Sequence, residues 1–185
     1  MIEANRVDEI DAALALARDF RLKIAIAGGV EAWLCADRLA AARVPVLTGA
    51  MSNIPDSFAT LNQRQENAAL LRKAGVQVVI VATENSDVTR YNARNIKYEA
   101  GNAVAYGMSY DDALRAVTLT PAELFGLSDR IGSLQTGREA NLVVWSGDPF
   151  EFSTQVEHVF IRGREVKEPS RQDLLIERYK PKPGR

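Results

Sequence analysis

The sequence is poor in the side chains that bind metals or form covalent cross-links. Its 185 residues include one cysteine, Cys35, and one histidine, His158. A single thiol excludes an internal disulfide, and one thiol with one imidazole excludes a cysteine/histidine metal cluster within this chain. Cys35 lies in the apolar run from Ala32 to Ala36, where we expect it to be a small buried hydrophobic residue rather than a reactive thiol.

Long apolar runs and an excess of one charge are also missing. No run approaches the roughly 20 apolar residues of a membrane-spanning helix, and Met1 to Arg6 lacks the form of a signal peptide. The net charge is -1, so no overall field favours nucleic acid or an anionic membrane. With 46% hydrophobic and 25% charged residues, the composition is typical of a globular protein. We expect no nucleic-acid or membrane partner, and a cytoplasmic location is favoured.

Short apolar segments alternate with helical patterns over the first two thirds of the chain. Helices are expected over Val7 to Phe20, Val30 to Arg43, Leu61 to Ala74 and Asn92 to Tyr106, followed by one capped by Ser109. Strands are expected over Leu22 to Ala27, Val44 to Thr48 and Val76 to Ala82, with Ile2 to Ala4 as a candidate fourth. This alternation predicts a parallel α/β fold, and four strands would be half of an eight-stranded barrel.

The pattern changes after Pro121, where turn-forming residues separate short strands. Strands are expected over Asn141 to Trp145 and Val156 to Arg162, with a turn at Gly163. A short capped helix should begin at Ser170. We therefore predict three regions: an α/β part over 1–126, a small β segment over 127–168, and a helix with a tail over 169–185.

The most specific pattern lies between Ala113 and Gly163. In order, it contains TLTPAELFGL (118–127), RIGSL (130–134), GREANLVVW (137–145) and GDP (147–149). These pieces closely resemble the C-terminal signature of the amidohydrolase superfamily, and nearly the whole chain looks like imidazolonepropionase-type relatives. Two departures are mild: Asn141 stands where the family usually has Asp, and Arg138 where it usually has Lys.

The resemblance implies a fold and an activity. The fold is a TIM barrel, of which this chain would hold about strands 5–8, beside a small β domain that also takes strands from the N-terminal part of the protein. The activity is metal-dependent hydrolysis of carbon–nitrogen bonds other than peptide bonds, in cyclic amide or imidazolone-like small molecules. A bound divalent ion would activate water and polarise the scissile carbonyl.

The resemblance also implies a ligand set at the carboxyl ends of the barrel strands. The family places a His-x-His pair on strand 1, Lys or Glu on strand 4, histidines on strands 5 and 6, and Asp on strand 8. Here Glu3 and Gly28 stand at the two histidine positions, and Glu84 stands near the Asp, with Asp87 as a second candidate. Glu84 and Asp87 are the predicted catalytic residues, and Glu84 is the candidate ligand for zinc or another divalent metal, unless this chain binds none.

Other polar residues near these positions have competing interpretations. Asn53 and Asp56 follow the expected third strand and are candidates for substrate binding. Glu84 and Asp87 are also compatible with an ordinary solvated loop, in which Arg90 or Arg94 would pair with them at the surface. Glu31 is expected to stabilise the start of its own helix. His158, far along the chain from all of these, is expected to be a structural residue on a strand.

Two functional hypotheses follow from these patterns. In the first, the chain is part of a hydrolase whose barrel is completed by a missing N-terminal half, and the isolated chain is inactive. In the second, the fold has lost its metal site and serves as a binding or structural module. In both cases half a barrel leaves sheet edges open, and open edges favour association. We therefore expect a homo-oligomer.

Overall fold

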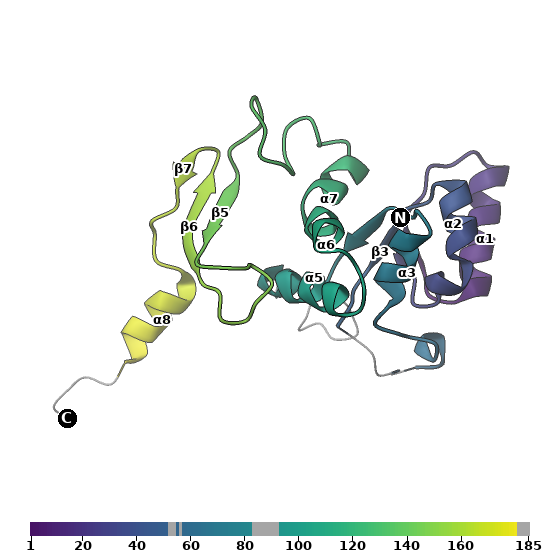
Figure 1. Ribbon diagram of the computed structural model, residues 1–185, viewed down its shortest axis with the longest axis horizontal. Coiled ribbons are helices and arrows are strands. Elements are labelled where there is room, and N and C mark those ends of the chain that lie inside the picture. Colours follow the sequence, from purple (N-terminus) through teal and green to yellow (C-terminus); the bar gives the residue numbers. More distant parts are fainter. Residues whose placement is uncertain (52–54, 56, 83–92, 181–185) are drawn as a thin grey trace.

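The computed structural model describes residues 1–51, 55, 57–82 and 93–180. A four-stranded sheet carrying helices is followed by a separate three-stranded sheet and a terminal helix (Figure 1). The first sheet consists of β1 (Ile2–Ala4), β2 (Ile26–Gly28), β3 (Val46–Thr48) and β4 (Val78–Ile80), in that order. Every neighbouring pair is parallel, which confirms the parallel α/β arrangement and the candidate strand at Ile2.

Helices and helical turns follow each of these strands in the chain. They are α1 (Val7–Asp19), η1 (Ala32–Cys35), α2 (Ala36–Ala42), η2 (Phe58–Thr60), α3 (Asn67–Lys73), η3 (Ala93–Asn95), α5 (Ile96–Ala105), α6 (Tyr110–Val117) and α7 (Leu119–Leu124). Ser109 caps α6 as expected, because its side-chain oxygen accepts a hydrogen bond from the Asp112 amide.

The parallel sheet has two faces with different packing. Ile26, Val46 and Val78 face the helices and belong to the main core, together with Ile10 of α1 and Leu39 of α2. Full burial of one such aliphatic side chain stabilises the fold by about 1.5–3 kcal/mol. The opposite face carries a smaller buried cluster, which consists of Ala25, Leu47 and Val79. The main core therefore lies between the sheet and the helices.

Several expected element boundaries were wrong, and the side chains show why. The strand expected from Leu22 begins only at Ile26, because Arg21 adopts a left-handed conformation (φ 53°) and the Leu22 amide bonds back to α1. The helix expected from Leu61 begins at Asn67. There the indole N–H of Trp33 donates to the Asn62 carbonyl oxygen, an acceptor that a helix would otherwise use.

The second sheet is antiparallel and confirms the expected change of character. It contains β5 (Leu142–Trp145), β6 (Val156–Ile161) and β7 (Arg164–Glu165) in that order. Arg162 and Gly163 form the two-residue turn between β6 and β7, and both have positive φ (51° and 76°), as tight hairpins require. The chain ends in α8 (Arg171–Tyr179), which is capped by Ser170 and has no buried residue.

Contacts from the 147–152 segment attach the second sheet to the helices. The ring of Phe152 stacks on Tyr98 of α5 at 4.3 Å, and Phe150 lies 4.9 Å from Tyr110 of α6. A Cβ atom at Gly101 of α5 would come within 3.2 Å of Phe150, so glycine allows this close approach. Among the described residues, no helix is long and apolar enough to cross a membrane.

Candidate functional site

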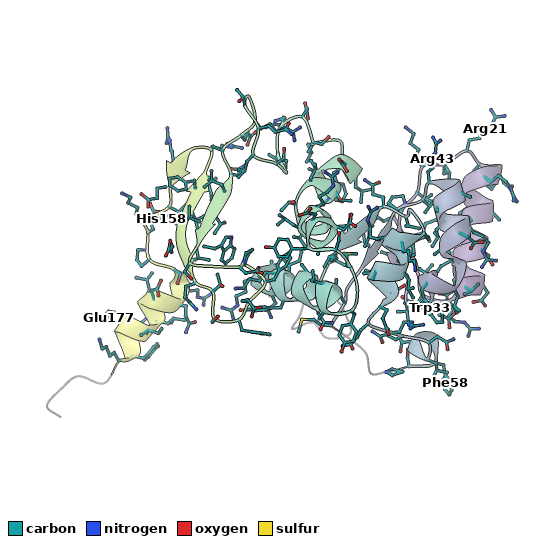
Figure 2. The ribbon with its side chains drawn as sticks, viewed as in Figure 1. Arg21, Trp33, Arg43, Phe58, His158 and Glu177 are labelled. Atoms are coloured by element: carbon teal, nitrogen blue, oxygen red, sulfur yellow. The ribbon has the colours of Figure 1, made fainter. Side chains whose placement is uncertain are left out.

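The carboxyl ends of the four parallel strands form the candidate functional edge. Parallel strands present these ends, and the loops that follow them, at one edge of the sheet. In Figure 2, Trp33 and Phe58, which follow β2 and β3, lie at the lower right of the molecule. Arg21 and Arg43, which precede the same two strands, lie at the upper right. The view therefore separates the candidate edge from the amino ends of the strands.

The four predicted catalytic and substrate residues cannot be placed at this edge. Asn53 and Asp56 on the connection after β3, and Glu84 and Asp87 after β4, lie outside the described residues. Their roles remain predictions. The structure does describe the backbone that leads to both segments, through Met51 and through Ala82.

The two positions at which the family places histidine are both described. Glu3 is exposed, and its register with Ala27, Leu47 and Val79 puts these four residues in one row across the sheet. Since Leu47 and Val79 belong to the smaller cluster, Glu3 lies on the face turned away from the main core. A single carboxylate in this row is one potential metal ligand.

Gly28 occupies a place that is unfavourable for a side chain. Its φ is +90°, and an added Cβ atom would lie 2.3 Å from Oδ1 of Asn5. L-residues rarely adopt this conformation, and the Asn5 side chain already fills the space. The absence of histidine at this position is therefore accompanied by a backbone conformation that L-residues rarely adopt, and by an Asn5 side chain that would have to move to admit a Cβ atom.

Glu31 has a different role from the one expected. Its Oε2 accepts a hydrogen bond from the Val7 amide at 2.8 Å, and its Oε1 accepts one from Asn62 Nδ2 at 2.8 Å. Val7 is the first residue of α1, so Glu31 stabilises the N-terminus of α1 rather than that of its own helical turn. It satisfies a backbone N–H that has no partner within α1.

Asn67 connects three segments at the candidate edge and was not identified from the sequence. Its side chain is 4% exposed. Its Nδ2 donates to the Gly29 carbonyl at 2.9 Å and lies 3.4 Å from Thr48 Oγ1, while its Oδ1 accepts from the Trp33 amide at 3.1 Å. Asn67 therefore holds the ends of β2 and β3 and the start of η1 together.

Glu99 and Asn102 of α5 hold the start of the connection after β3. Oε2 of Glu99 accepts hydrogen bonds from the amides of Ala50 and Met51 at 2.6 and 2.7 Å. Nδ2 of Asn102 donates to the Ala50 carbonyl oxygen. These contacts join residues about 50 positions apart in the chain, and no local sequence pattern indicated them.

The described residues do not form a metal site by themselves. Among them, no group of three or more His, Cys, Asp or Glu side chains is placed to hold an ion. At the candidate edge, both oxygens of Glu31 are engaged by N–H donors. His158 is exposed on β6, where its Nδ1 lies 2.6 Å from Glu165 Oε1, in agreement with the structural role expected for it. Cys35 is fully buried and burial raises the pKa of its thiol, which confirms its expected environment.

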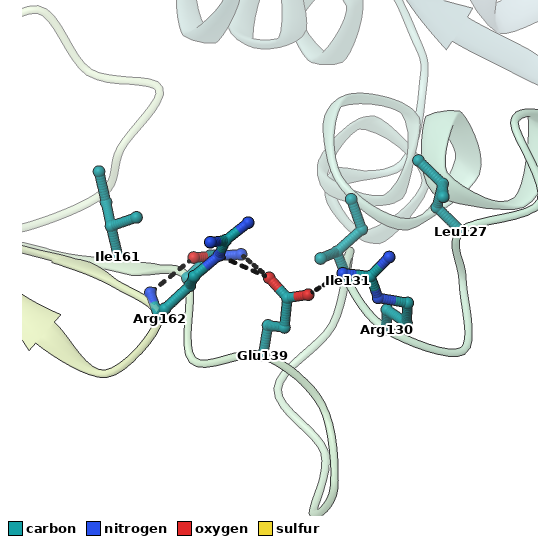
Figure 3. A pocket seen from close by; sticks show the side chains of 7 residues that line it. Leu127, Arg130, Ile131, Glu139, Ile161 and Arg162 are labelled. Carbon is teal, nitrogen blue, oxygen red and sulfur yellow. Dashed lines mark hydrogen bonds and ion pairs between the residues drawn. The ribbon is translucent and has the colours of Figure 1, made fainter.

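A pocket of about 560 Å³ lies away from the candidate edge, between the α7–β5 connection and the turn after β6 (Figure 3). Glu139 bridges two arginines there: it contacts Arg130, and its Oε2 lies 3.6 Å from Nε of Arg162. The Arg130 guanidinium holds the pKa of the Glu139 carboxyl below its usual range. Among the described residues that line this pocket, the carboxylate of Glu139 is already paired with both arginines, which favours a structural role for it.

Most of this chain is similar in sequence to known proteins. The sequence model of the Amidohydrolase family matches residues 4–166. The amidohydrolase tasK of Hapsidospora irregularis is 36% identical over 78 residues, which are 42% of this chain and 8% of that protein. The imidazolonepropionase of Thermoplasma volcanium is 29% identical over 135 residues, covering 68% of this chain and 32% of that protein.

Solved structures give the same picture of the fold. An amidohydrolase from Thermotoga maritima superimposes with a TM-score of 0.80 at 32% identity, over 90% of this chain and 43% of the other. A zinc-bound adenosine deaminase from Xanthomonas campestris has a TM-score of 0.54 at 23% identity, over 87% of this chain and 43% of the other, which is a likeness of fold alone. The chain spans less than half the length of each of these relatives.

Proposed function

This chain belongs to the amidohydrolase family, and from that premise we propose that it is the C-terminal part of a metal-dependent hydrolase acting on carbon–nitrogen bonds other than peptide bonds. One observation carries the proposal: the family match runs through both the parallel sheet and the small β segment. The similarity to the family therefore extends over both sheets of this chain and is not limited to a short motif.

We further propose that β1 to β4 are strands 5–8 of a barrel whose remaining strands lie in another part of the protein. The parallel sheet ends in β1 on one side and β4 on the other, and both edges are where further strands would pair. The proposed regions stay as 1–126 for the barrel part, 127–168 for the β segment and 169–185 for the helix and tail.

The substrate proposed is a small cyclic amide of the imidazolone type. Support comes from the imidazolonepropionases among the relatives, such as those of Thermoplasma volcanium and Sphingopyxis alaskensis. In this proposal Asn53 and Asp56 contact the substrate, because they follow β3 at the edge where ligands bind in parallel α/β folds. Substrate recognition is shared with loops from the rest of the barrel.

Glu84 and Asp87 are proposed as the catalytic residues of this chain. A carboxylate at the end of a barrel strand is suited to accept a proton from the attacking water and to donate a proton to the leaving nitrogen. In the family a divalent ion supplies Lewis acidity to this chemistry. The described residues do not complete a ligand set, so in this proposal further ligands come from the missing strands.

The alternative of a catalytically decayed module gains no support from the relatives, whose names describe amidohydrolases and imidazolonepropionases. The feature that originally suggested it, the replacement of two histidines by Glu3 and Gly28, concerns only part of the expected ligand set. A test on the complete protein separates the two possibilities.

The test is metal content and hydrolysis measured on the complete natural polypeptide. We expect stoichiometric zinc or another divalent metal, and turnover of at least one member of a panel of cyclic amides. Glu84→Gln and Asp87→Asn should lower the rate by about a hundredfold or more, the usual contribution of a general acid or base. Glu177→Gln, on the exposed helix α8, is the matched control and should not. A complete protein without metal or turnover would show that the proposal is wrong.

A further inference from the structure

Glu99 is a carboxylate in the interior of the protein. It is 5% exposed, on the face of α5 that also buries Ala100 and Ala103. A carboxylate is unfavourable in such a place unless N–H groups compensate for the lost water. The amides of Ala50 and Met51 supply two such donors, both to Oε2 at 2.6 and 2.7 Å. Hydrogen bonds to an ionised acceptor are short and about twice as strong as neutral ones.

Asn102 completes this arrangement from the next turn of the same helix. Glu99 and Asn102 are three positions apart, so their side chains lie on one side of α5. Asn102 donates to the Ala50 carbonyl oxygen, while Glu99 accepts from the Ala50 amide. Both backbone polar groups of Ala50, together with the Met51 amide, are therefore held by α5. Ala50 is 2% exposed, so water has little access to its amide and carbonyl groups.

We propose that Glu99 and Asn102 form a clamp that positions the connection after β3 for substrate binding. The inference rests on the proposed function, because Asn53 and Asp56 lie two and five positions after Met51 in this connection. The same helix follows, in sequence, the segment that contains Glu84 and Asp87. Helix α5 therefore follows the predicted catalytic segment in sequence, and its clamp residues bind the backbone that leads into the predicted substrate segment.

Glu99 and Asn102 are treated as positioning residues, because the contacts on which the clamp rests are made to the backbone of Ala50 and Met51. A purely structural role predicts that removing Glu99 loosens the protein as a whole. The clamp predicts a local effect at Ala50 and Met51. Glu99→Gln is a suitable variant because it keeps the shape and one oxygen acceptor and removes the charge. Glu99→Ala removes the acceptor altogether.

The experiment is hydrogen exchange by mass spectrometry on the complete protein, in peptides that cover 47–51. We expect protection there to fall about tenfold in Glu99→Gln and about a hundredfold in Glu99→Ala, as loss of charge-assisted hydrogen bonds predicts. Peptides covering β2 should be unchanged. Asp112→Asn is the matched control: it disrupts the carboxylate on α6 that pairs with Arg72 and should leave 47–51 protected.

Steady-state kinetics add a second readout, the change in KM relative to kcat, which a purely structural role of Glu99 would not predict. Glu99→Gln should raise KM about tenfold with kcat nearly unchanged, since only substrate positioning is weakened. Unchanged protection at 47–51, or an equal loss of protection throughout the protein, would overturn the clamp. So would a fall in kcat at constant KM. If the complete protein hydrolyses no cyclic amide, the proposed function fails and with it the substrate role, while local loss of exchange protection would still establish the contact of α5 with Ala50 and Met51.

Discussion

Replacement of Gly28 by alanine tests whether the candidate edge excludes a side chain at the position where the family has histidine. The Gly28 backbone has φ +90°, and the new Cβ atom would lie 2.3 Å from Asn5 Oδ1. Two costs follow. The left-handed backbone conformation costs an L-residue about 1–2 kcal/mol. Displacing the Asn5 side chain from its rotamer costs about 0.5–1.5 kcal/mol more. The expected loss in free energy of unfolding is therefore about 1.5–3.5 kcal/mol.

Gly75 provides a matched control for the backbone part of this cost. Its φ is +89°, and no heavy atom lies within 4 Å of an added Cβ. Gly75→Ala should therefore cost about 1–2 kcal/mol, from the backbone alone. The difference between the two variants measures the contact with Asn5. In an Asn5→Ala background that difference should disappear, because the obstructing oxygen is gone.

The measurement is urea unfolding of the purified chain, compared at constant m and at equal protein concentration because association adds to apparent stability. The reasoning would be refuted if Gly28→Ala were no more destabilising than Gly75→Ala. It would also be refuted if the difference persisted without the Asn5 side chain. Gly28→His should be at least as destabilising as Gly28→Ala, because it meets the same backbone conformation and the same Asn5 side chain.

Three further predictions concern the rest of the chain. Asn67→Ala leaves the Gly29 carbonyl and the Trp33 amide without this partner and should lower the free energy of unfolding in urea by about 2–4 kcal/mol. The control Asn62→Ala changes an exposed residue and should lower it by less than about 1 kcal/mol. Equal losses in the two variants would contradict the role of Asn67. Hydrogen bonding from Ser109, with Arg72 beside it, holds the pKa of Asp112 below its usual 3.8, so its contribution to stability is present above that pH and lost as the pH falls through the lower value of the folded state. Asp112→Asn should therefore flatten the acid limb of a plot of Tm against pH, and an unchanged limb would count against it. The isolated chain should sediment as a dimer or larger species, because β1 and β4 pair with no further strand in the part of the chain that the structure describes; a monodisperse monomer would contradict this.

The general architecture was predictable because it depends on patterns close together in the sequence. Alternation of apolar segments and helices indicated the parallel sheet, and the turn residues around Gly163 indicated the antiparallel one. The capping role of Ser109 was predictable for the same reason. Element boundaries were less predictable: the helix before Gly75 starts late because Trp33, far away in sequence, bonds the Asn62 carbonyl.

The polar contacts at the candidate edge could not be predicted from one sequence. Asn67 and Glu99 are ordinary helix residues in a linear reading, and only folding brings them to Gly29 and to Ala50. Glu31 was assigned to the wrong helix because its partner, the Val7 amide, lies 24 residues away. Burial and long-range hydrogen bonding define these roles, and neither is encoded in local spacing.

The small size of Gly101 has a consequence for how the two sheets communicate. On α5, Gly101 accepts the close approach of Phe150, and Tyr98 stacks on Phe152 from the segment that leads into β6. The same helix carries Glu99, which holds Ala50. A displacement of α5 thus acts on both contacts at once. The attachment of the antiparallel sheet and the backbone after β3 therefore depend on the position of one and the same helix.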